Sequence, residues 1–325
     1  MDDFRTILKV TPSPFKLELK DKVFTIGSCF SDNLGNLLQD HKFETLVNPF
    51  STVYNPLSIH KALQYAIRAS MPAADTFGQL NGTFFNYDFH SSFSSLTASA
   101  VEKSLQNTIQ RSHLFLRQSS VVFITYGTSW IYERTDNGDV VSNCHKVAAK
   151  NFRKSLLTQK KIIESFEELM KDLLEFNPNI KVILTVSPVR HLKDTLELNA
   201  VSKSILRLAC HTLSELYPQV EYFPAYEIVL DDLRDYRFYD RDLLHPSPAA
   251  IDYIWEKFQE RYFTLETRGF VHEWSEIRKG LAHKAFQPSS KAHQAFLQQL
   301  LSRVKELKGM VNVDKEIAQV EKQLI

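Results

Sequence analysis

The chain has 325 residues, a length that allows one large domain with an extension, or two domains. Hydrophobic residues make up 43% of the chain and charged residues 24%, proportions that are typical of a globular protein and exclude wholesale disorder. The 39 basic and 38 acidic side chains leave a formal net charge of +1, so the charge favours neither nucleic acid nor an anionic membrane as a partner.

Sequence signals for cofactors, metals and export are weak. Neither glycine-rich phosphate-binding pattern occurs, and the chain has only 9 glycines. The three cysteines, Cys29, Cys144 and Cys210, are too far apart for a CxxC pair, so we expect no disulfide framework, no metal site and no cofactor. The opening MDDFRTILKV lacks the layout of a signal peptide, and no apolar run approaches the ~18 residues of a membrane span. We therefore expect a cytoplasmic protein.

The first predicted strand and helix lie near the N-terminus. Residues 23–27 (VFTIG) form a short apolar run, which indicates a buried strand. Three short polar residues follow, Ser31, Asp32 and Asn33, and any of them can cap a helix that runs to about Gln39. This order predicts a strand, a tight turn and a helix.

Strands and helices alternate through the middle of the chain. Further strands are predicted at 120–126, 181–187 and 220–229, the last interrupted or moved to a sheet edge by Pro224. Helical spacing of apolar residues predicts helices at 57–67, 152–176, 195–215 and 248–263. Residues 76–95 read as loops, and Asp136-Asn137-Gly138 predicts a hairpin turn. The alternation favours a parallel sheet with helices on both faces, with its chemistry at the carboxyl ends of the strands.

The composition changes after about residue 264. Residues 290–325 are rich in Lys, Gln, Glu and Leu, and their apolar side chains fall at helical spacing. We therefore divide the chain into an α/β domain over 1–265 and a C-terminal helical extension over 266–325. We expect the extension to pack on its own domain; the alternative is that it joins a partner or a second copy of the chain.

The strongest local signal is the stretch Thr25-Ile-Gly-Ser-Cys-Phe-Ser31, where the first strand turns into its helix. A side chain at such a turn projects above the sheet, and the helix N-terminus favours a negative charge there. Cys29 and Ser28 are both candidate nucleophiles, and for Cys29 we expect a lowered thiol pKa. The alternative is that Cys29 is a small buried side chain.

A second signal is Asp242-Leu243-Leu244-His245, just before the last helix of the α/β domain. Asp242 and His245 are three residues apart on a loop, so the carboxylate can bind one imidazole nitrogen and leave the other free. A general base requires this arrangement. Many loops carry such a pair only as helix caps or surface contacts, and that alternative stays open.

A third signal follows the strand at 120–126. Gly127 lets the backbone approach a ligand closely, and the Ser129 hydroxyl could donate a hydrogen bond to an oxyanion. The alternative is a simple turn.

Three further histidines, His90, His145 and His191, are candidates for lining the same site, although a lone loop histidine is more often structural. His145 directly follows Cys144 in a stretch that reads as a strand. Neighbouring side chains on a strand point to opposite faces, so we expect no dyad between them.

Taken together, these stretches resemble the GSCFA family of the SGNH/GDSL hydrolase superfamily. The signature stands here as Gly27-Ser28-Cys29-Phe30-Ser31, with Ser31 in place of the final alanine. The other matching stretches are 48–56 (NPFSTVYNP), 88–91 (DFHS), 127–130 (GTSW), 143–146 (NCHK), 187–191 (SPVRH) and 242–247 (DLLHPS). The resemblance covers roughly residues 20–265. It implies a three-layer α/β/α sandwich and the hydrolysis or transfer of acyl esters.

The resemblance also implies roles for the residues of the turn and of the last loop. The superfamily's first block reads Gly-Asp-Ser with Ser as nucleophile, which places Cys29 at the nucleophile position and leaves Ser28 as the alternative. The superfamily's Asp-x-x-His block matches Asp242 and His245 in full.

The blocks that supply the oxyanion hole match less well. The superfamily reads Gly-x-Asn-Asp where this chain has Gly127-Thr128-Ser129-Trp130, so Ser129 takes the place of the oxyanion-binding Asn. The oxyanion glycine of the second block has no clear counterpart, and the region of Phe50 and Ser51 is our nearest assignment.

Two functions follow as hypotheses. In the first, Asp242 orients His245, which activates Cys29 for attack on a small-molecule or carbohydrate ester, in an esterase or an acyltransferase. In the second, the fold is a non-catalytic module that binds glycans through aromatic loops such as 84–93, or that assembles as a homo-oligomer through its C-terminal helices.

Overall fold

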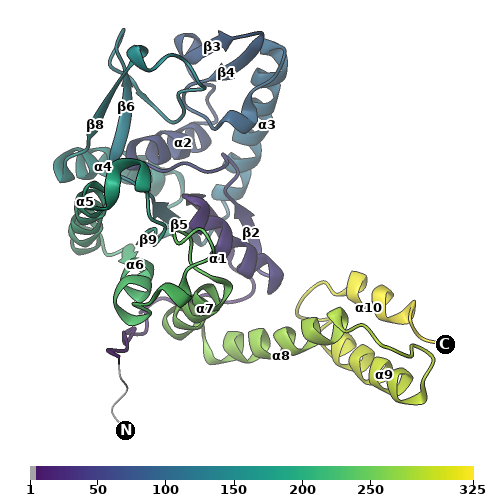
Figure 1. Cartoon of the computed structure of the whole chain (residues 1–325). Helices are drawn as coiled ribbons and strands as arrows, with labels where there is room; N and C mark the ends of the chain where they lie inside the picture. Colours follow the sequence, from purple (N-terminus) through teal and green to yellow (C-terminus); the bar gives the residue numbers. More distant parts are fainter. Residues whose placement is uncertain (1–4) are drawn as a thin grey trace.

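The computed structural model describes residues 5–325, whose centre is a five-stranded parallel sheet (Figure 1). Its strands, in spatial order, are β10 (Val220–Tyr222), β9 (Lys181–Val186), β5 (Val121–Tyr126), β1 (Lys22–Gly27) and β2 (Glu44–Val47). The predicted α/β class is confirmed.

The strand order reverses between β1 and β5. From β1 the chain proceeds to β2 on one side and then returns to β5, β9 and β10 on the other. In open α/β sheets such a switch point opens a crevice outside the carboxyl ends of the two strands. Gly27 at the end of β1 pairs with Thr125 of β5, so the residues that follow these two strands meet at the carboxyl edge of the sheet, at this switch point.

Helices cover both faces of the sheet, because its strands are apolar on both sides. Phe24 and Ile26 face one layer, whereas Val23 faces the other. The first layer holds α2 (Pro56–Arg68), α3 (Ala98–Leu116), α4 (Gln159–Phe176) and α5 (Thr195–Leu216). The second holds α1 (Cys29–Asp40), α6 (Ala225–Glu227) and α7 (Pro248–Tyr262). The result is the three-layer α/β/α sandwich that the resemblance implied.

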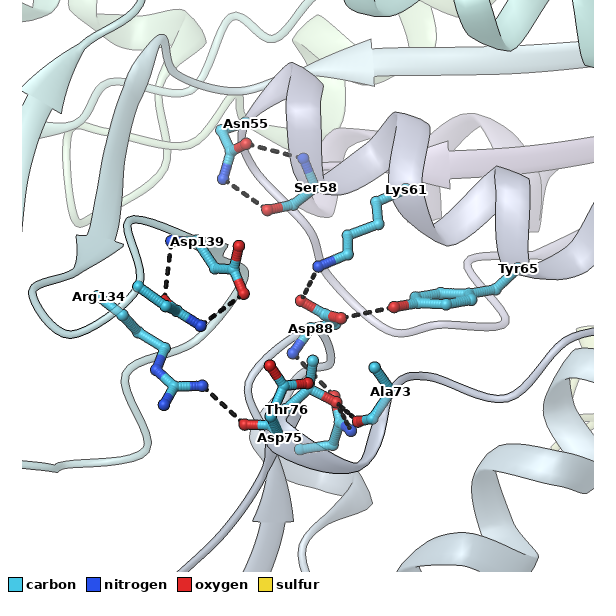
Figure 2. Close-up of polar contacts among 12 residues, drawn as sticks. Asn55, Ser58, Lys61, Tyr65, Ala73, Asp75, Thr76, Asp88, Arg134 and Asp139 are labelled. Atoms are coloured by element: carbon cyan, nitrogen blue, oxygen red, sulfur yellow. Dashed lines mark hydrogen bonds and ion pairs between the residues drawn. The ribbon is translucent and has the colours of Figure 1, made fainter.

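Two small antiparallel sheets lie at the top of the molecule as drawn in Figure 1. One pairs β3 (Phe77–Leu80) with β4 (Thr83–Asn86), and the other has the order β7 (Val140–Val141), β6 (Trp130–Arg134) and β8 (Phe152–Leu156). Figure 2 shows hydrogen bonds that join the segment after β4 to α2 and the two small sheets to each other. The buried carboxylate of Asp88 accepts hydrogen bonds from Lys61 and Tyr65 of α2, both at 2.7 Å, and Arg134 donates to the carbonyl of Asp75.

Several predicted boundaries were wrong. The first helix begins at Cys29 and is capped by Ser28, not by a residue at 31–33. Residues 152–156 form β8, and α4 begins only at Gln159. Residues 76–95 include the hairpin of β3 and β4. The strand expected within 220–229 is confirmed as the edge strand β10, which stops at Tyr222, before Pro224. The short strand β2 and the helix α3 were not predicted, whereas the hairpin around Gly138 is confirmed.

The C-terminal helices α8 (Leu265–Ala282), α9 (Lys291–Glu306) and α10 (Asp314–Glu321) pack on the domain through the end of α1. The Trp274 indole donates to the carbonyl of Asp40 at 2.7 Å, and Lys42 pairs with Glu316 of α10 at 2.7 Å. Between α1, α7, α8 and α10 lies a cavity of about 1050 Å³. Among residues 5–325, no helix combines the length and apolarity needed to cross a membrane.

A buried histidine on α2 predicts acid sensitivity. His60 is 1% exposed and binds Tyr126 of β5 at 2.6 Å and Ser165 of α4 at 2.9 Å. Burial lowers its pKa from 6.5 to about 3. The unfolded chain therefore binds the extra proton first, so stability is lost as the pH falls from 6.5 towards 3.

We expect the free energy of unfolding to fall by about 3 kcal/mol between pH 6.5 and pH 4 from this group alone. Urea unfolding at the two pH values measures the change. In His60→Gln this contribution to the pH dependence of stability disappears. The same pH dependence in the wild type and the variant would contradict its assignment to His60.

Candidate active site

The turn between β1 and α1 holds Cys29 at the carboxyl edge of the sheet. Gly27 has φ = 138°, and a Cβ there would lie 2.2 Å from the carbonyl oxygen of Thr125, so only glycine fits. Ser28 is the N-cap of α1, and its hydroxyl accepts from the Phe30 N–H at 3.4 Å. Cys29 is therefore the first residue of the helix and remains partly exposed.

His245 and Asp242 lie directly beside this thiol. The Cys29 Sγ is 3.6 Å from His245 Nε2, and His245 Nδ1 is 2.6 Å from Asp242 Oδ2. The other carboxylate oxygen of Asp242 accepts the backbone N–H groups of Leu244 and His245. These N–H groups and the imidazole lower the pKa of Asp242 to about 2. An ionised Asp242 favours the tautomer with a proton on Nδ1, which leaves Nε2 free to accept the thiol proton.

The pKa of the Cys29 thiol is raised, not lowered as we expected. Burial raises it first, and the nearby carboxylate of Asp32 raises it further. The N–H groups of Cys29 and Phe30 at the helix N-terminus, together with Lys203, oppose this rise without overcoming it. The resting thiol is therefore protonated, and reaction requires a base to remove its proton.

Neutralising Asp32 is expected to increase the reactivity of Cys29. Asp32 is partly buried and holds the amide of Asn48 at 2.8 Å, an interaction that an amide oxygen can also make. In Asp32→Asn we expect the rate of Cys29 alkylation by iodoacetamide at pH 7.5 to rise by about 3- to 10-fold. Peptide mass spectrometry measures the rate at Cys29 alone.

The matched control is Asp40→Asn, which removes a carboxylate from the opposite end of α1. This variant should leave the rate at Cys29 unchanged. A rate in Asp32→Asn equal to that of the wild type would contradict the electrostatic role of Asp32.

The two predicted nucleophiles differ in their surroundings. Ser28 is 1% exposed, and its hydroxyl serves as the helix cap, whereas Cys29 is partly exposed and has His245 within reach. Of the two, we keep Cys29 as the candidate nucleophile.

We expected the Ser129 hydroxyl to bind an oxyanion and Gly127 to let the backbone approach a ligand, and in the structure both residues make hydrogen bonds within the protein. The N–H of Gly127 donates to the carbonyl of Tyr54 at 2.8 Å. Ser129 is fully buried, and its hydroxyl binds Ser202 of α5 at 3.1–3.2 Å. Both donors are occupied within the protein. Gly127 allows its backbone to pack closely against the nucleophile turn, because a Cβ there would lie 3.3 Å from the Cβ of Ser28.

Ser51 and His90 bind each other. Ser51 Oγ lies 3.1 Å from His90 Nδ1, and the same nitrogen accepts the N–H of Ser92. The neighbouring Phe50 and Phe89 rings pack together in the core, with their centroids 5.8 Å apart. This contact joins the segment after β2 to the segment after β4, and it gives neither Ser51 nor His90 a contact with Cys29.

His145 has a structural position. Its ring stacks on Phe85 at 4.3 Å, and its Nε2 lies 2.8 Å from the carbonyl oxygen of Asn86. The residue has φ = 49° in a turn, so the strand that we expected at Cys144 and His145 is absent.

Of the five Phe and Tyr residues in 84–93, two are buried and three are half-buried. Phe85 is 2% exposed and Phe89 is fully buried, so these rings belong to the core.

His191 lies close to the reactive pair, together with two residues that the sequence analysis did not select. Burial, with smaller contributions from the neighbouring Lys203 and His245, lowers the pKa of His191 to about 4, so its ring is neutral near pH 7. The ring contacts Tyr54 edge-on at 5.5 Å. In the sequence, Tyr54 lies within the NPFSTVYNP stretch. The only signal for Lys203 is that a lysine stands among the apolar residues of α5.

Within residues 5–325, no group of three or more His, Cys, Asp or Glu side chains is placed to hold a metal ion. The 1050 Å³ cavity is lined by α1, α7, α8 and α10 and includes none of the residues around Cys29.

The sequence profile of the GSCFA family matches residues 22–258, which include Cys29, Asp242 and His245. The chain belongs to the GSCFA family. A second profile, that of the C-terminal domain of GSCFA domain proteins, matches residues 274–325. No curated protein is significantly similar to this GSCFA chain.

Two of the solved structures with distant similarity to this GSCFA protein come from Corynascus thermopiles and Talaromyces cellulolyticus. One is a carbohydrate esterase family 2 enzyme with its carbohydrate binding domain from Corynascus thermopiles (Myceliophthora fergusii), at 11% identity and a TM-score of 0.37 over 82% of this chain and 68% of that chain. The other is a carbohydrate esterase family 3 structure from Talaromyces cellulolyticus, at 10% identity and a TM-score of 0.29 over 79% and 99%. Both are too distant to support an argument, so the fold assignment depends on the sheet and helices described above.

Proposed function

We propose that this GSCFA protein is an acyl-transfer enzyme in which Cys29 is the nucleophile, His245 the general base and Asp242 the residue that orients it. The observation that carries the proposal is the 3.6 Å approach of the Cys29 thiol to the imidazole nitrogen opposite Asp242. A nucleophile, a base and an orienting group within hydrogen-bond reach form the arrangement of covalent acyl transfer.

In the first half of the reaction, His245 Nε2 takes the thiol proton as the sulfur attacks the carbonyl carbon of an ester. The carbonyl oxygen becomes an oxyanion, for which the N–H of Cys29 at the start of α1 is the nearest candidate donor. The intermediate then expels the alcohol oxygen, which receives the proton from His245. The product is an acyl thioester on Cys29.

In the second half, a water molecule or an acceptor hydroxyl attacks the thioester while His245 takes its proton. The bond to sulfur breaks, the sulfur recovers the proton, and a carboxylic acid or a new ester leaves. Because a thioester is a competent acyl donor, the same site serves hydrolysis and transfer. Acylated carbohydrates are the substrate class that we would test first.

The reaction can be tested by linking turnover to one thiol. We expect hydrolysis of p-nitrophenyl acetate, or of acetylated xylose, to fall in proportion to the fraction of Cys29 alkylated by iodoacetamide. Cys144, the other partly exposed thiol, provides the control through Cys144→Ala. Turnover that persists after complete alkylation of Cys29 would contradict the proposal.

A further inference from the structure

Lys203 of α5 is the most deeply buried charged side chain near the reactive pair. It is 1% exposed, and its ammonium donates to the carbonyl oxygens of Gly127 and Ser187, both at 2.7 Å. These carbonyls belong to the residues directly after β5 and β9. Burying a lysine is unfavourable unless its hydrogen bonds are satisfied, so the bridge between the two strand ends needs a reason.

The first strand end supports the turn that carries Cys29. Gly127 is packed closely against this turn, because a Cβ at Gly127 would lie 3.3 Å from the Ser28 Cβ. The N–H groups of Gly127 and Thr128 both donate to the carbonyl of Tyr54, at 2.8 and 3.1 Å. A contact that fixes the carbonyl of Gly127 therefore also holds the turn that carries Cys29 in place.

The second strand end leads to the loop that carries His245. The Ser187 hydroxyl accepts from the N–H of Val189 at 3.3 Å, which shapes the segment after β9. The next residue, Arg190, donates its N–H to the carbonyl of Leu244 at 3.3 Å. Leu244 directly precedes His245, so a chain of short contacts runs from Lys203 to the imidazole.

We propose that Lys203 is a positioning residue that fixes the His245 loop relative to the Cys29 turn, an inference that rests on the proposed function. It acts through two backbone carbonyls and does not need to touch substrate. Burial lowers its pKa to about 7, yet two N–H bonds suffice for the two carbonyls, and both the ammonium and the neutral amine retain them. The bridge therefore persists on either side of neutral pH.

The bridge can be tested by measuring how strongly His245 accelerates alkylation of Cys29. Four proteins are compared at pH 7.5 with iodoacetamide: wild type, Lys203→Met, His245→Ala and the double variant. If Lys203 acts by placing His245, Lys203→Met slows alkylation about 10-fold in the wild-type background and less than about 2-fold when His245 is absent. A merely destabilising substitution does not produce this non-additivity.

Two results would overturn the proposal. One is an unchanged rate in folded Lys203→Met, and the other is an equal slowing in both backgrounds, which would mean that the lysine acts on the thiol by charge alone. Equal rates in wild type and His245→Ala would instead reject the proposed function itself. Circular dichroism establishes folding, and if Lys203→Met does not fold, Lys203→Gln takes its place in the same cycle.

Cys210→Ala is the matched control for damage to the helix. Cys210 is fully buried on α5 and touches neither carbonyl of the bridge, so its loss destabilises the same helix without breaking the bridge. We expect this variant to alkylate Cys29 at the wild-type rate. A slowing equal to that of Lys203→Met would also count against a specific role for Lys203.

Discussion

Replacing Cys29 with alanine is expected to reduce kcat for ester turnover by about 1000-fold or more. The variant keeps the helix cap at Ser28 and the pair of Asp242 and His245, so only the atom that forms the covalent bond is lost. Because the side chain is partly exposed, we expect the thermal midpoint to stay close to that of the wild type. Initial rates with p-nitrophenyl acetate measure the effect.

Cys29→Ser refines the same prediction. A hydroxyl is harder to deprotonate than a thiol. Burial and the carboxylate of Asp32 both disfavour a negative charge at this position. We therefore expect the serine variant to be weakly active, between the wild type and Cys29→Ala. Wild-type turnover in Cys29→Ala, with Cys144→Ala as the control that retains activity, would contradict the role of the thiol.

Removing the base or the carboxylate that orients it is the second change with a large expected effect. His245→Ala should reduce kcat by about 1000-fold, because the thiol is protonated at rest and loses its proton acceptor. Asp242→Asn should reduce kcat by about 100-fold or more, since an amide can turn its NH2 group towards Nδ1. That orientation puts the imidazole proton on Nε2, from which the thiol proton can no longer be accepted.

The stability of these two variants separates catalysis from folding. Asp242 and His245 are 45% and 46% exposed, so their replacement should leave the thermal midpoint close to that of the wild type. Asp240→Asn, an exposed neighbour on the same loop, is the matched control and should retain kcat. Since the pKa of Asp242 is about 2, the acid limb of the wild-type pH profile does not come from this carboxylate. Full activity in His245→Ala would exclude His245 as the general base.

The sequence was most informative where chemistry and backbone geometry coincide. Gly27 must be glycine because the turn leaves no space beside Thr125, and the same turn presents Cys29 at the strand end. Asp242 and His245 are close in sequence, so their spacing suggested the pair, and the expected parallel sheet suggested that Cys29 lies near it.

Other features depend on contacts between distant segments, which a single sequence does not reveal. Ser129 looks like a free donor until α5 brings Ser202 against it. The helix N-terminus should lower the pKa of Cys29, but the burial produced by the surrounding loops reverses the direction. Apolar spacing likewise suggested a helix over 152–156, where pairing with β6 makes a strand. Lys203 was overlooked because a lysine among apolar residues carries no motif of its own.

Trapping the covalent intermediate tests the central claim most directly. Wild-type protein is mixed with p-nitrophenyl acetate, quenched in acid within the first turnovers, digested and analysed by mass spectrometry. We predict one acetyl group on the peptide containing Cys29, in an amount equal to the burst of p-nitrophenol, and none in Cys29→Ala. Turnover with no acetylated Cys29, or an acetyl group on Ser28 instead, would contradict the account.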